Sequence, residues 1–302
     1  ADNNTAVGYL ALGANTTGTG NTAVGASALD ASTTASYNVA IGLSALSADT
    51  LGAHAVAIGA GALSRQNFTS ATNNYNIGIG YDAGLNVTTG IENTLIGGLA
   101  GDAITDADYN VAVGKGALGT NQLGSRNTAV GTNSLHIANP ESAVNTYNTA
   151  FGYDAGYAVT TGIYNTLIGG LAGDAITTAN YNTAVGGSSL SATTTGAQNV
   201  AVGTSALGLN TTASNNTAIG FEALYANTTG TSNVAMGSYS LDANTTGNYN
   251  VGVGEATLSA NTTANNNTAV GFSALADNTT GDENNAIGGG ALGNNTTGVD
   301  ND

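Results

Sequence analysis

The sequence predicts an all-β protein, a parallel β-solenoid with 17 coils of about 17 residues each. The first observation behind this prediction is a glycine that recurs at sixteen intervals, fourteen of 17 residues and two of 21 residues. The second is the length of the unit, which is too short for two helices and a turn but sufficient for two short strands and two turns. Spacing this strict indicates stacked units that each contact only their neighbours.

We number each repeat from this glycine, which is position 0. The glycine stands at Gly8, Gly25, Gly42, Gly59, Gly80, Gly97, Gly114, Gly131, Gly152, Gly169, Gly186, Gly203, Gly220, Gly237, Gly254, Gly271 and Gly288.

The residues before the glycine have the alternation of a short strand. Position −1 is always apolar, position −3 is mostly Thr or Val, and position −2 is mostly Ala. This pattern places positions −3 and −1 on one face and position −2 on the other. We expect the aliphatic residue at −1 and the leucine at +4 to form the buried set. One coil has little interior, so an alternative is that only one set fits inside and the other lines an axis between subunits.

The second half of the unit carries Ala at +3, Leu at +4 in thirteen units, and an Asn-Thr-Thr-Gly turn. Position −4 is Asn in sixteen of seventeen units, the exception being Ala55. Its side chain fits two roles: an amide ladder from coil to coil, or a turn in which the Asn bonds its own backbone.

The period predicts one repeat domain over residues 1–302, with an internal duplication at an offset of 72 residues. Residues 75–118 and 147–190 are identical at 32 of 44 positions. The two long intervals, within 59–80 and 131–152, predict a surface loop extended by four residues in each case.

Four units lack the leucine at +4 and have glycine there instead. In two of them, Gly101 and Gly173, a leucine has moved to position −2, as Leu95 and Leu167, which predicts that it fills the same interior volume. In the other two, Gly84 and Gly156, no such exchange occurs, so we expect Tyr81 and Tyr153 to compensate.

Composition excludes several function classes. Only 7% of the residues are charged and the net charge is −16, with Arg65, Lys115 and Arg126 as the only basic side chains besides two histidines. Too few cations are present to neutralise a nucleic-acid backbone. No apolar run approaches the roughly 20 residues of a membrane-spanning helix. No cysteine is present, so disulfides do not stabilise the fold. The start at Ala1, without a visible signal peptide, fits a processed secreted protein or an excised fragment.

The repeat string, seen well at residues 216–232, resembles the head region of trimeric autotransporter adhesins. It also resembles the repeat shaft of phage tail-fibre and bacterial surface proteins of the endosialidase-chaperone type. The resemblance covers essentially the whole chain. It implies a left-handed parallel β-roll, trimerised along its axis, with a fibre or adhesive role.

The residues that could carry chemistry are few, and we predict no catalytic, cofactor-binding or metal-binding residue. His54 and His136 lie outside the strand positions and are expected to be solvated loop residues. A glycine string at 288–290 has no helix or lysine to make a phosphate loop. Four aspartates recur in the duplicated block, and we interpret them as turn formers because calcium repeats carry carboxylates in most coils. They are Asp82, Asp102, Asp154 and Asp174.

Two patterns each have a structural and a functional interpretation. Asn-x-Thr sequons would be glycosylation sites in a secretory route, or turn chemistry copied with the repeat, which we favour. The sequons include Asn15, Asn227, Asn244, Asn261, Asn278 and Asn295. Tyrosines that precede the −4 Asn either form an exposed stripe for carbohydrate contact or cover the edge of the roll. They include Tyr37, Tyr75, Tyr109, Tyr147, Tyr181 and Tyr249.

The leading functional hypothesis is a non-enzymatic fibre or adhesin, located outside the cell, on its surface or on a virion. Its expected partners are copies of itself, as a homotrimer or an end-to-end polymer, with a cell-surface glycan or receptor as a further candidate. The alternative is a secreted filament of stacked solenoid subunits, since the chain begins and ends in repeat-like sequence without a polar cap. Ice binding by a threonine array ranks last, because Val, Ile or Asn replaces threonine at −3 in many units.

Overall fold

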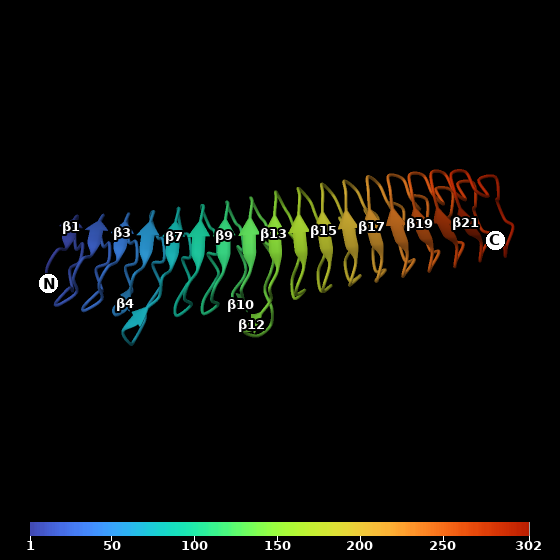
Figure 1. Ribbon diagram of the computed structural model, residues 1–302. Helices are drawn as coiled ribbons and strands as arrows, with labels where there is room; N and C mark the ends of the chain where they lie inside the picture. The colour runs from blue at the N-terminus through green and yellow to red at the C-terminus, as the bar shows by residue number, and fades with distance from the viewer. Residues whose placement is uncertain (302) are drawn as a thin grey trace. The chain divides into compact units, whose positions relative to one another are not determined.

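The computed structural model describes residues 1–301, and these contain only short β-strands, turns and bends, without a helix. The chain falls into two compact units, Ala1–Ala150 and Phe151–Asp302, each of which is a parallel β-solenoid with one coil per repeat (Figure 1). The units together hold about 17 coils of roughly 17 residues, which confirms the predicted fold class. That residues 1–302 form one repeat domain stays a prediction.

Each coil contributes one three-residue strand to a parallel sheet. In the first unit these strands are β1 (Thr5–Val7), β2 (Thr22–Val24), β3 (Val39–Ile41), β5 (Val56–Ile58), β7 (Ile77–Ile79), β8 (Thr94–Ile96), β9 (Val111–Val113) and β11 (Thr128–Val130). The division between the units falls within β13 (Thr149–Phe151). In the second unit they are β14 (Thr166–Ile168), β15 (Thr183–Val185), β16 (Val200–Val202), β17 (Thr217–Ile219), β18 (Val234–Met236), β19 (Val251–Val253), β20 (Thr268–Val270) and β21 (Asn285–Ile287).

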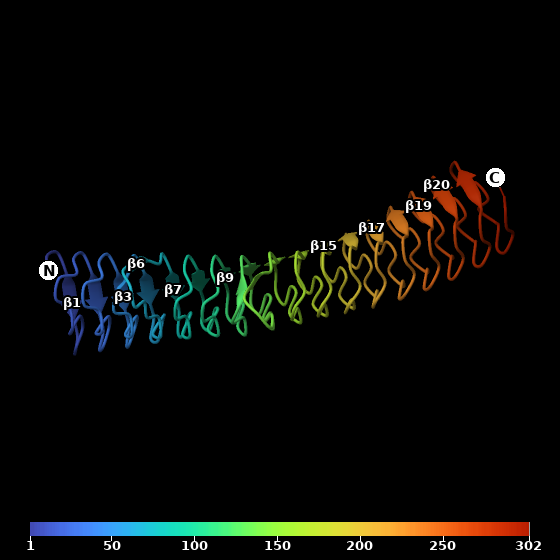
Figure 2. The same ribbon diagram turned by 90° about the horizontal axis from the view of Figure 1, so that it is seen from below.

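The sheet register places like residues directly above like residues. Ala201 of β16, for example, pairs with Ala184 of β15 and with Ala218 of β17. Seen from below, the strands of the second unit follow one side of the stack and the turns follow the other (Figure 2).

The glycine at position 0 is required by its backbone and by the next coil. Gly186 has a φ of +134°, which residues with a side chain rarely adopt. A Cβ built on Gly186 would lie 2.5 Å from the carbonyl oxygen of Gly203 in the next coil. The repeat therefore keeps glycine here because two neighbouring backbones approach too closely for any larger residue.

The structure corrects the predicted buried set. The −2 residues, such as Ala23 and Ala201, are fully buried together with the +3 alanines and the +4 leucines. The −1 aliphatic residues point the other way and remain partly exposed, as Ile219 does at 36%. The reason is the thinness of the coil, because a leucine that reaches across from +4 leaves room only for a methyl group at −2. The interior of one chain therefore holds the +4 leucines but not the −1 aliphatic residues as well.

Two columns of buried asparagine complete the interior. At −4, the Asn233 side-chain oxygen accepts the backbone N–H of Asn250 at 2.9 Å and the Asn250 amide at 3.2 Å. The Asn250 amide also donates to the Ala264 carbonyl at 2.7 Å. The −4 column is thus a ladder between coils, as the first of the two interpretations predicted, although most of its bonds involve the neighbouring backbone.

The second column stands at +7, at the start of the turn. From Asn227 to Asn295, each side-chain amide donates to the side-chain oxygen of the preceding coil, at 3.0 Å from Asn244 to Asn227 and at 2.9 Å from Asn261 to Asn244. The same amide of Asn244 donates to the Gly247 carbonyl at 3.1 Å. Because these groups are buried, the bonds satisfy polar atoms that would otherwise lack a partner and destabilise the fold.

The exchange of leucine and glycine between −2 and +4 is confirmed. A Cβ on Gly101 would lie 2.7 Å from Leu95 Cδ2, and a Cβ on Gly84 in the preceding coil would lie 2.7 Å from Leu95 Cδ1. One leucine at −2 therefore occupies the space of two missing leucines at +4. Val87 also lies close to the Gly84 site, at 3.3 Å.

The predicted compensation by tyrosine is wrong. Tyr81 and Tyr153 are 64% and 59% exposed, so neither ring enters the interior. Buried Val87 and Val159 stand instead at +7, where most coils carry a polar residue. In the coil of Gly84, Val87 fills the interior together with Leu63 and Leu95 of the two neighbouring coils.

Each four-residue extension in the first unit adds a pair of two-residue parallel strands. These are β4 (Gly52–Ala53) with β6 (Thr72–Asn73), and β10 (Gly124–Ser125) with β12 (Val144–Asn145). Figure 1 shows β4, and β10 with β12, projecting from the row of coils. Buried Phe68 and Pro140 pack against Gly52 and Gly124 and hold the extensions in place.

Candidate functional site

Two surfaces of the solenoid are candidates for function. The first surface is the outward face of the sheet in each unit. The second is a hollow beside the first four-residue extension.

The outward sheet face consists of the side chains at −3 and −1. Its −1 column is aliphatic in every coil of the first unit and contains Phe151 and Met236 in the second, which are 57% and 42% exposed. None of the main-sheet strands carries a charged residue. Parallel sheets are normally covered on both faces, so one uncovered apolar face is unusual for this type of sheet. We call positions −3 and −1 of the strands the outward face.

The residues at −5, immediately before the −4 Asn, form a stripe along each unit, which was one of the two interpretations of the tyrosine pattern. Every non-glycine residue at −5 has a φ between 51° and 66°, a left-handed conformation that turns its side chain outward. In the second unit Tyr164 and Tyr181 stack with ring centroids 5.3 Å apart. In the first unit two groups of three side chains form beside the two extensions.

His54 lies in the first of these groups. Its ring centroid is 5.3 Å from that of Tyr37 and 5.3 Å from that of Tyr75. The Nδ1 atom is buried, and no hydrogen-bond partner reaches it among the described residues. The expectation of a solvated loop histidine is therefore wrong, because the neighbouring rings hold the imidazole in a half-buried stack.

Arg126 takes the equivalent place in the second group. Its guanidinium carbon lies 4.5 Å from the centroid of the Tyr109 ring and 5.9 Å from that of Tyr147. Its Nε also donates to the Asn145 side-chain oxygen at 3.2 Å. These cation–π contacts cover the ring faces that would otherwise be open to a ligand.

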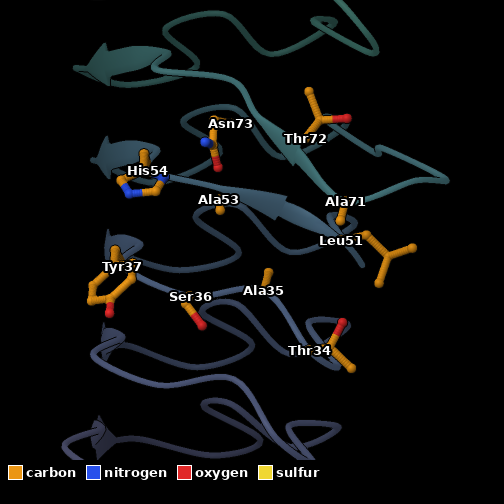
Figure 3. Close-up of a pocket in the computed structure, with 10 residues that line it drawn as sticks. All are labelled: Thr34, Ala35, Ser36, Tyr37, Leu51, Ala53, His54, Ala71, Thr72 and Asn73. Atoms are coloured by element: carbon orange, nitrogen blue, oxygen red, sulfur yellow. The ribbon is translucent and has the colours of Figure 1, made fainter.

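A hollow of about 280 Å³ lies next to the Tyr37–His54 pair, between these rings and the β4–β6 strands. Figure 3 shows the rings of Tyr37 and His54 broadside at one edge of the hollow, with the hydroxyl groups of Ser36 and Thr72 on other sides. Thr34 and Asn73 add exposed polar side chains to the lining. No charged residue lines this hollow.

The hollow lies beside the extension, where Ala53 replaces the polar side chain that most coils carry at position −6. In other coils the side-chain oxygen at −6 accepts the backbone N–H of the preceding coil, as Ser36 does from Thr19 at 3.0 Å and Asp108 does from Ile91 at 2.8 Å. Ala53 has no such oxygen for the Ser36 N–H. The missing side chain and the displaced extension together leave the space open.

The second extension has a different hollow, of about 230 Å³. Two carboxylates, Asp106 and Asp108, line it together with Ser125 and Asn145. Ser125 stands where Ala53 stands in the first extension, and its hydroxyl accepts the Asp108 N–H at 3.0 Å. The two extensions have the same pair of short parallel strands, but different side chains line their hollows.

His136 is also half-buried, so the expectation of a solvated loop is wrong here too. Its Nδ1 lies 2.7 Å from the Gly116 carbonyl oxygen. Gly119 leaves the space for the ring, since a Cβ there would lie 2.6 Å from the imidazole. His136 thus has a structural role between coils.

The duplicated aspartates lie in adjacent coils and not in a ligand cluster. Burial raises the pKa of Asp102, His136 lowers it, and the negative charge of Asp82 raises it again. Burial and the charge of Asp154 likewise raise the pKa of Asp174. Among residues 1–301, no group of three or more acidic or histidine side chains is placed to hold a metal ion.

The sequon asparagines belong to the +7 ladder. Asn227, Asn244, Asn261 and Asn278 have no exposed surface, so a glycan cannot be attached to them in the folded protein. Their amides bond to the turn and to the next coil, which supports the interpretation as repeated turn chemistry.

Sequence reasoning missed the hollow. The signal lay in the −6 column, where an alanine replaces a polar residue at the start of a long interval, next to an aromatic residue at −5. Within residues 1–301 no helix is long and apolar enough to cross a membrane. Comparison of the chain with protein families, with characterised proteins and with solved structures found no match.

Proposed function

We propose that this chain is a non-enzymatic structural element of an extracellular or virion fibre or adhesin, and that copies of it associate in parallel as a homotrimer. The observation that carries the proposal is the outward face, an uncharged surface with a continuous column of apolar residues at −1, on a parallel sheet in each unit. Contiguous apolar surfaces of more than a few hundred Å² on soluble proteins mark interaction sites.

A second copy of the chain is the partner that fits this face best. The face repeats at the spacing of stacked strands, about 4.8 Å. Another copy has the same spacing, so each coil of one copy meets a coil of the next along the whole unit. Because no strand of the face carries a charge, the net charge of −16 is kept away from the contact. Three copies around one axis is the arrangement implied by the resemblance to adhesin heads and fibre shafts.

The non-enzymatic part of the proposal has separate support. His54 is held between tyrosine rings and His136 bonds a backbone carbonyl of a neighbouring coil, so each has a packing role. We expect His136→Ala to leave assembly unchanged.

Sedimentation of a matched pair of double variants tests the proposal. Val202→Asp with Ile219→Asp places two carboxylates on the outward face, whereas Thr212→Asp with Thr229→Asp places them on exposed turn positions. We expect the unmodified chain and the turn variant to sediment as trimers at micromolar concentration, and the face variant as a monomer with an unchanged β circular dichroism spectrum. An unmodified chain that sediments as a monomer would remove the trimer.

Electron microscopy separates this proposal from the filament of stacked subunits. Discrete particles of uniform size support a closed oligomer, whereas particles that grow in length with concentration contradict it.

A further inference from the structure

We propose that the hollow beside Tyr37 binds one uncharged sugar residue, so that the β4–β6 extension is a glycan-binding site. This inference rests on the proposed adhesin role and names the ligand chemistry of one place in it.

The aromatic edge of the hollow suits the apolar face of a pyranose. Tyr37 is 61% exposed and lies at one edge of the group of side chains that line the hollow (Figure 3). His54 is stacked on it with an interplanar angle of 29°, which fixes the Tyr37 ring before any ligand arrives. Tyrosine offers a large apolar surface at a low cost in conformational entropy. A sugar ring that lies on Tyr37 would therefore gain apolar contact with little ordering of the protein.

The polar lining suits the hydroxyl groups of the sugar. The Ser36 hydroxyl accepts a bond from the Thr19 N–H, so its own hydrogen remains available to a ligand oxygen. The Ser36 N–H has no side-chain acceptor at Ala53 and offers a second donor. Asn73 is exposed and its amide can both donate and accept. An apolar ring face with a few hydrogen-bonding groups around it is the usual design of a small-molecule site.

Size and charge restrict the ligand further. A volume of about 280 Å³ lies just below the roughly 300–1,000 Å³ of drug-sized pockets, so one sugar residue fits and a long chain would extend out of the hollow. No cation lines the hollow, and the protein carries a net charge of −16. A sialic acid, uronic acid or sulfated sugar would be repelled, and this favours a neutral sugar.

A quaternary ammonium ion is the competing ligand, because it also binds aromatic faces and is attracted by negative charge. Such ions are usually held by a cage of several ring faces. Here His54 occupies one face of the Tyr37 ring and Tyr75 stacks on His54, so the rings form a row and no cage. No carboxylate lines the hollow to pair with a cation.

The test uses the full chain and an array of immobilised glycans that contains neutral hexoses, 6-deoxyhexoses and N-acetylhexosamines beside sialylated, uronic and sulfated glycans. We expect binding to at least one neutral glycan and none to its acidic counterparts. Absence of binding to every neutral glycan, or binding only to acidic ones, overturns the proposal. Displacement of the bound glycan by tetramethylammonium at a lower concentration than by the free neutral sugar also overturns it.

Three variants locate the site on the protein by titration of the best neutral glycan. Tyr37→Ala removes the ring, and Ala53→Asn fills the hollow with the residue that Asn180 and Asn248 provide at −6 in other coils. We expect each to weaken binding at least tenfold. Tyr249→Ala removes an equally exposed tyrosine at −5 in the second unit, away from any extension, and should leave binding unchanged. Equal losses in all three variants, or none in the first two, contradict the proposed site.

The same variants keep this inference separate from the proposed function. Ala53→Asn lies outside the outward face, so its sedimentation should match that of the unmodified chain. Glycan binding by a monomeric chain would refute the trimer and leave the sugar site standing. A trimer that binds no neutral glycan would refute the sugar site and leave the trimer standing.

Discussion

The leucine at +4 holds a left-handed backbone conformation in every coil that has it, with φ between 47° and 53°. For a residue with a side chain this conformation costs roughly 1–2 kcal/mol. Burial offsets the cost, because the leucine side chain fills the centre of the coil. The four coils with glycine at +4 keep the same left-handed conformation, with φ between 55° and 61°. Glycine therefore substitutes at +4 without a change of backbone, provided that another side chain fills the centre.

Leu95 and Gly101 should show strong energetic coupling. Leu95→Ala should cost about 3–5 kcal/mol, because it empties the space shared by Gly84 and Gly101. Gly101→Leu alone should also destabilise, since its Cβ would lie 2.7 Å from Leu95 Cδ2. The double variant should be more stable than the sum of the single effects by at least about 2 kcal/mol. Urea unfolding of the four proteins measures the coupling, and additive effects would contradict the exchange.

The +7 ladder supports a second prediction at the residue scale. Asn244→Ala removes both the donor to Asn227 at 3.0 Å and the acceptor for Asn261 at 2.9 Å. The buried carbonyl of Gly247 loses its bond from Asn244 as well, so three buried polar groups lose a partner, which should cost about 2–4 kcal/mol. Asn294→Ala, at an exposed position one residue before the same column, should change the unfolding free energy by less than about 0.5 kcal/mol. Equal effects in a denaturant titration would mean that the ladder contributes nothing.

At the scale of the strand, alternation revealed two faces but did not reveal which one lies inside. In most coils, position −1 carries a larger apolar residue than position −2, and a hydrophobicity argument alone assigns it to the interior. The correct assignment depends on the distance across a coil. This distance leaves room for one large side chain, usually Leu at +4 opposite Ala at −2. Sequence reasoning succeeded where one residue compensates another, as with Leu95 and Gly101. It failed where the compensation came from a different column, as with Val87.

The assignment of faces can be tested on β16. Ala201→Val adds two methyl groups to a fully buried position and should destabilise the solenoid by about 1–3 kcal/mol. Val202→Thr changes the outward face with the same side-chain shape and should leave the stability of the single chain within about 0.5 kcal/mol. Thermal unfolding of dilute protein compares the two. A larger loss for Val202→Thr would restore the original prediction of a buried −1 column.

The hollow marks the limit of what the sequence revealed at the scale of the element. The long interval predicted an extension, and an exposed stripe was one of the two interpretations of the tyrosine pattern. Their meeting at Ala53 depends on how β4 and β6 fold against the −5 column, which no period in the sequence encodes. A column-by-column comparison of coils would not have singled out Ala53, because Ile91, Ile163 and Ala197 also replace the commoner polar residue at −6.

At the scale of the whole molecule, burial favours the protonated form of several aspartates relative to the same groups in water. Burial raises the pKa of Asp49, Asp102, Asp174 and Asp242 above the ordinary aspartate value, and Glu222 raises that of Asp242 further. Oδ1 of Asp174 and of Asp242 is buried without a hydrogen-bond partner. These groups therefore tie the stability of both units to pH.

The folded chain should be most stable in mild acid. Between the unfolded pKa near 3.9 and the raised folded value of each aspartate, the folded state binds more protons than the unfolded state, so stability falls as pH rises. Self-repulsion from a net charge of −16 acts in the same direction but is screened by salt. Calorimetry at high ionic strength should thus still give a higher Tm at pH 4.5 than at pH 7.5. Asp242→Ser, which copies Ser191 and Ser259 of other coils, should raise the Tm at pH 7.5 and reduce the change of Tm with pH. As a control, Asp277→Ser removes the same charge from an exposed turn and should leave the change of Tm with pH in high salt unchanged. A Tm of the unmodified chain that rises toward neutral pH would contradict the role of the buried aspartates.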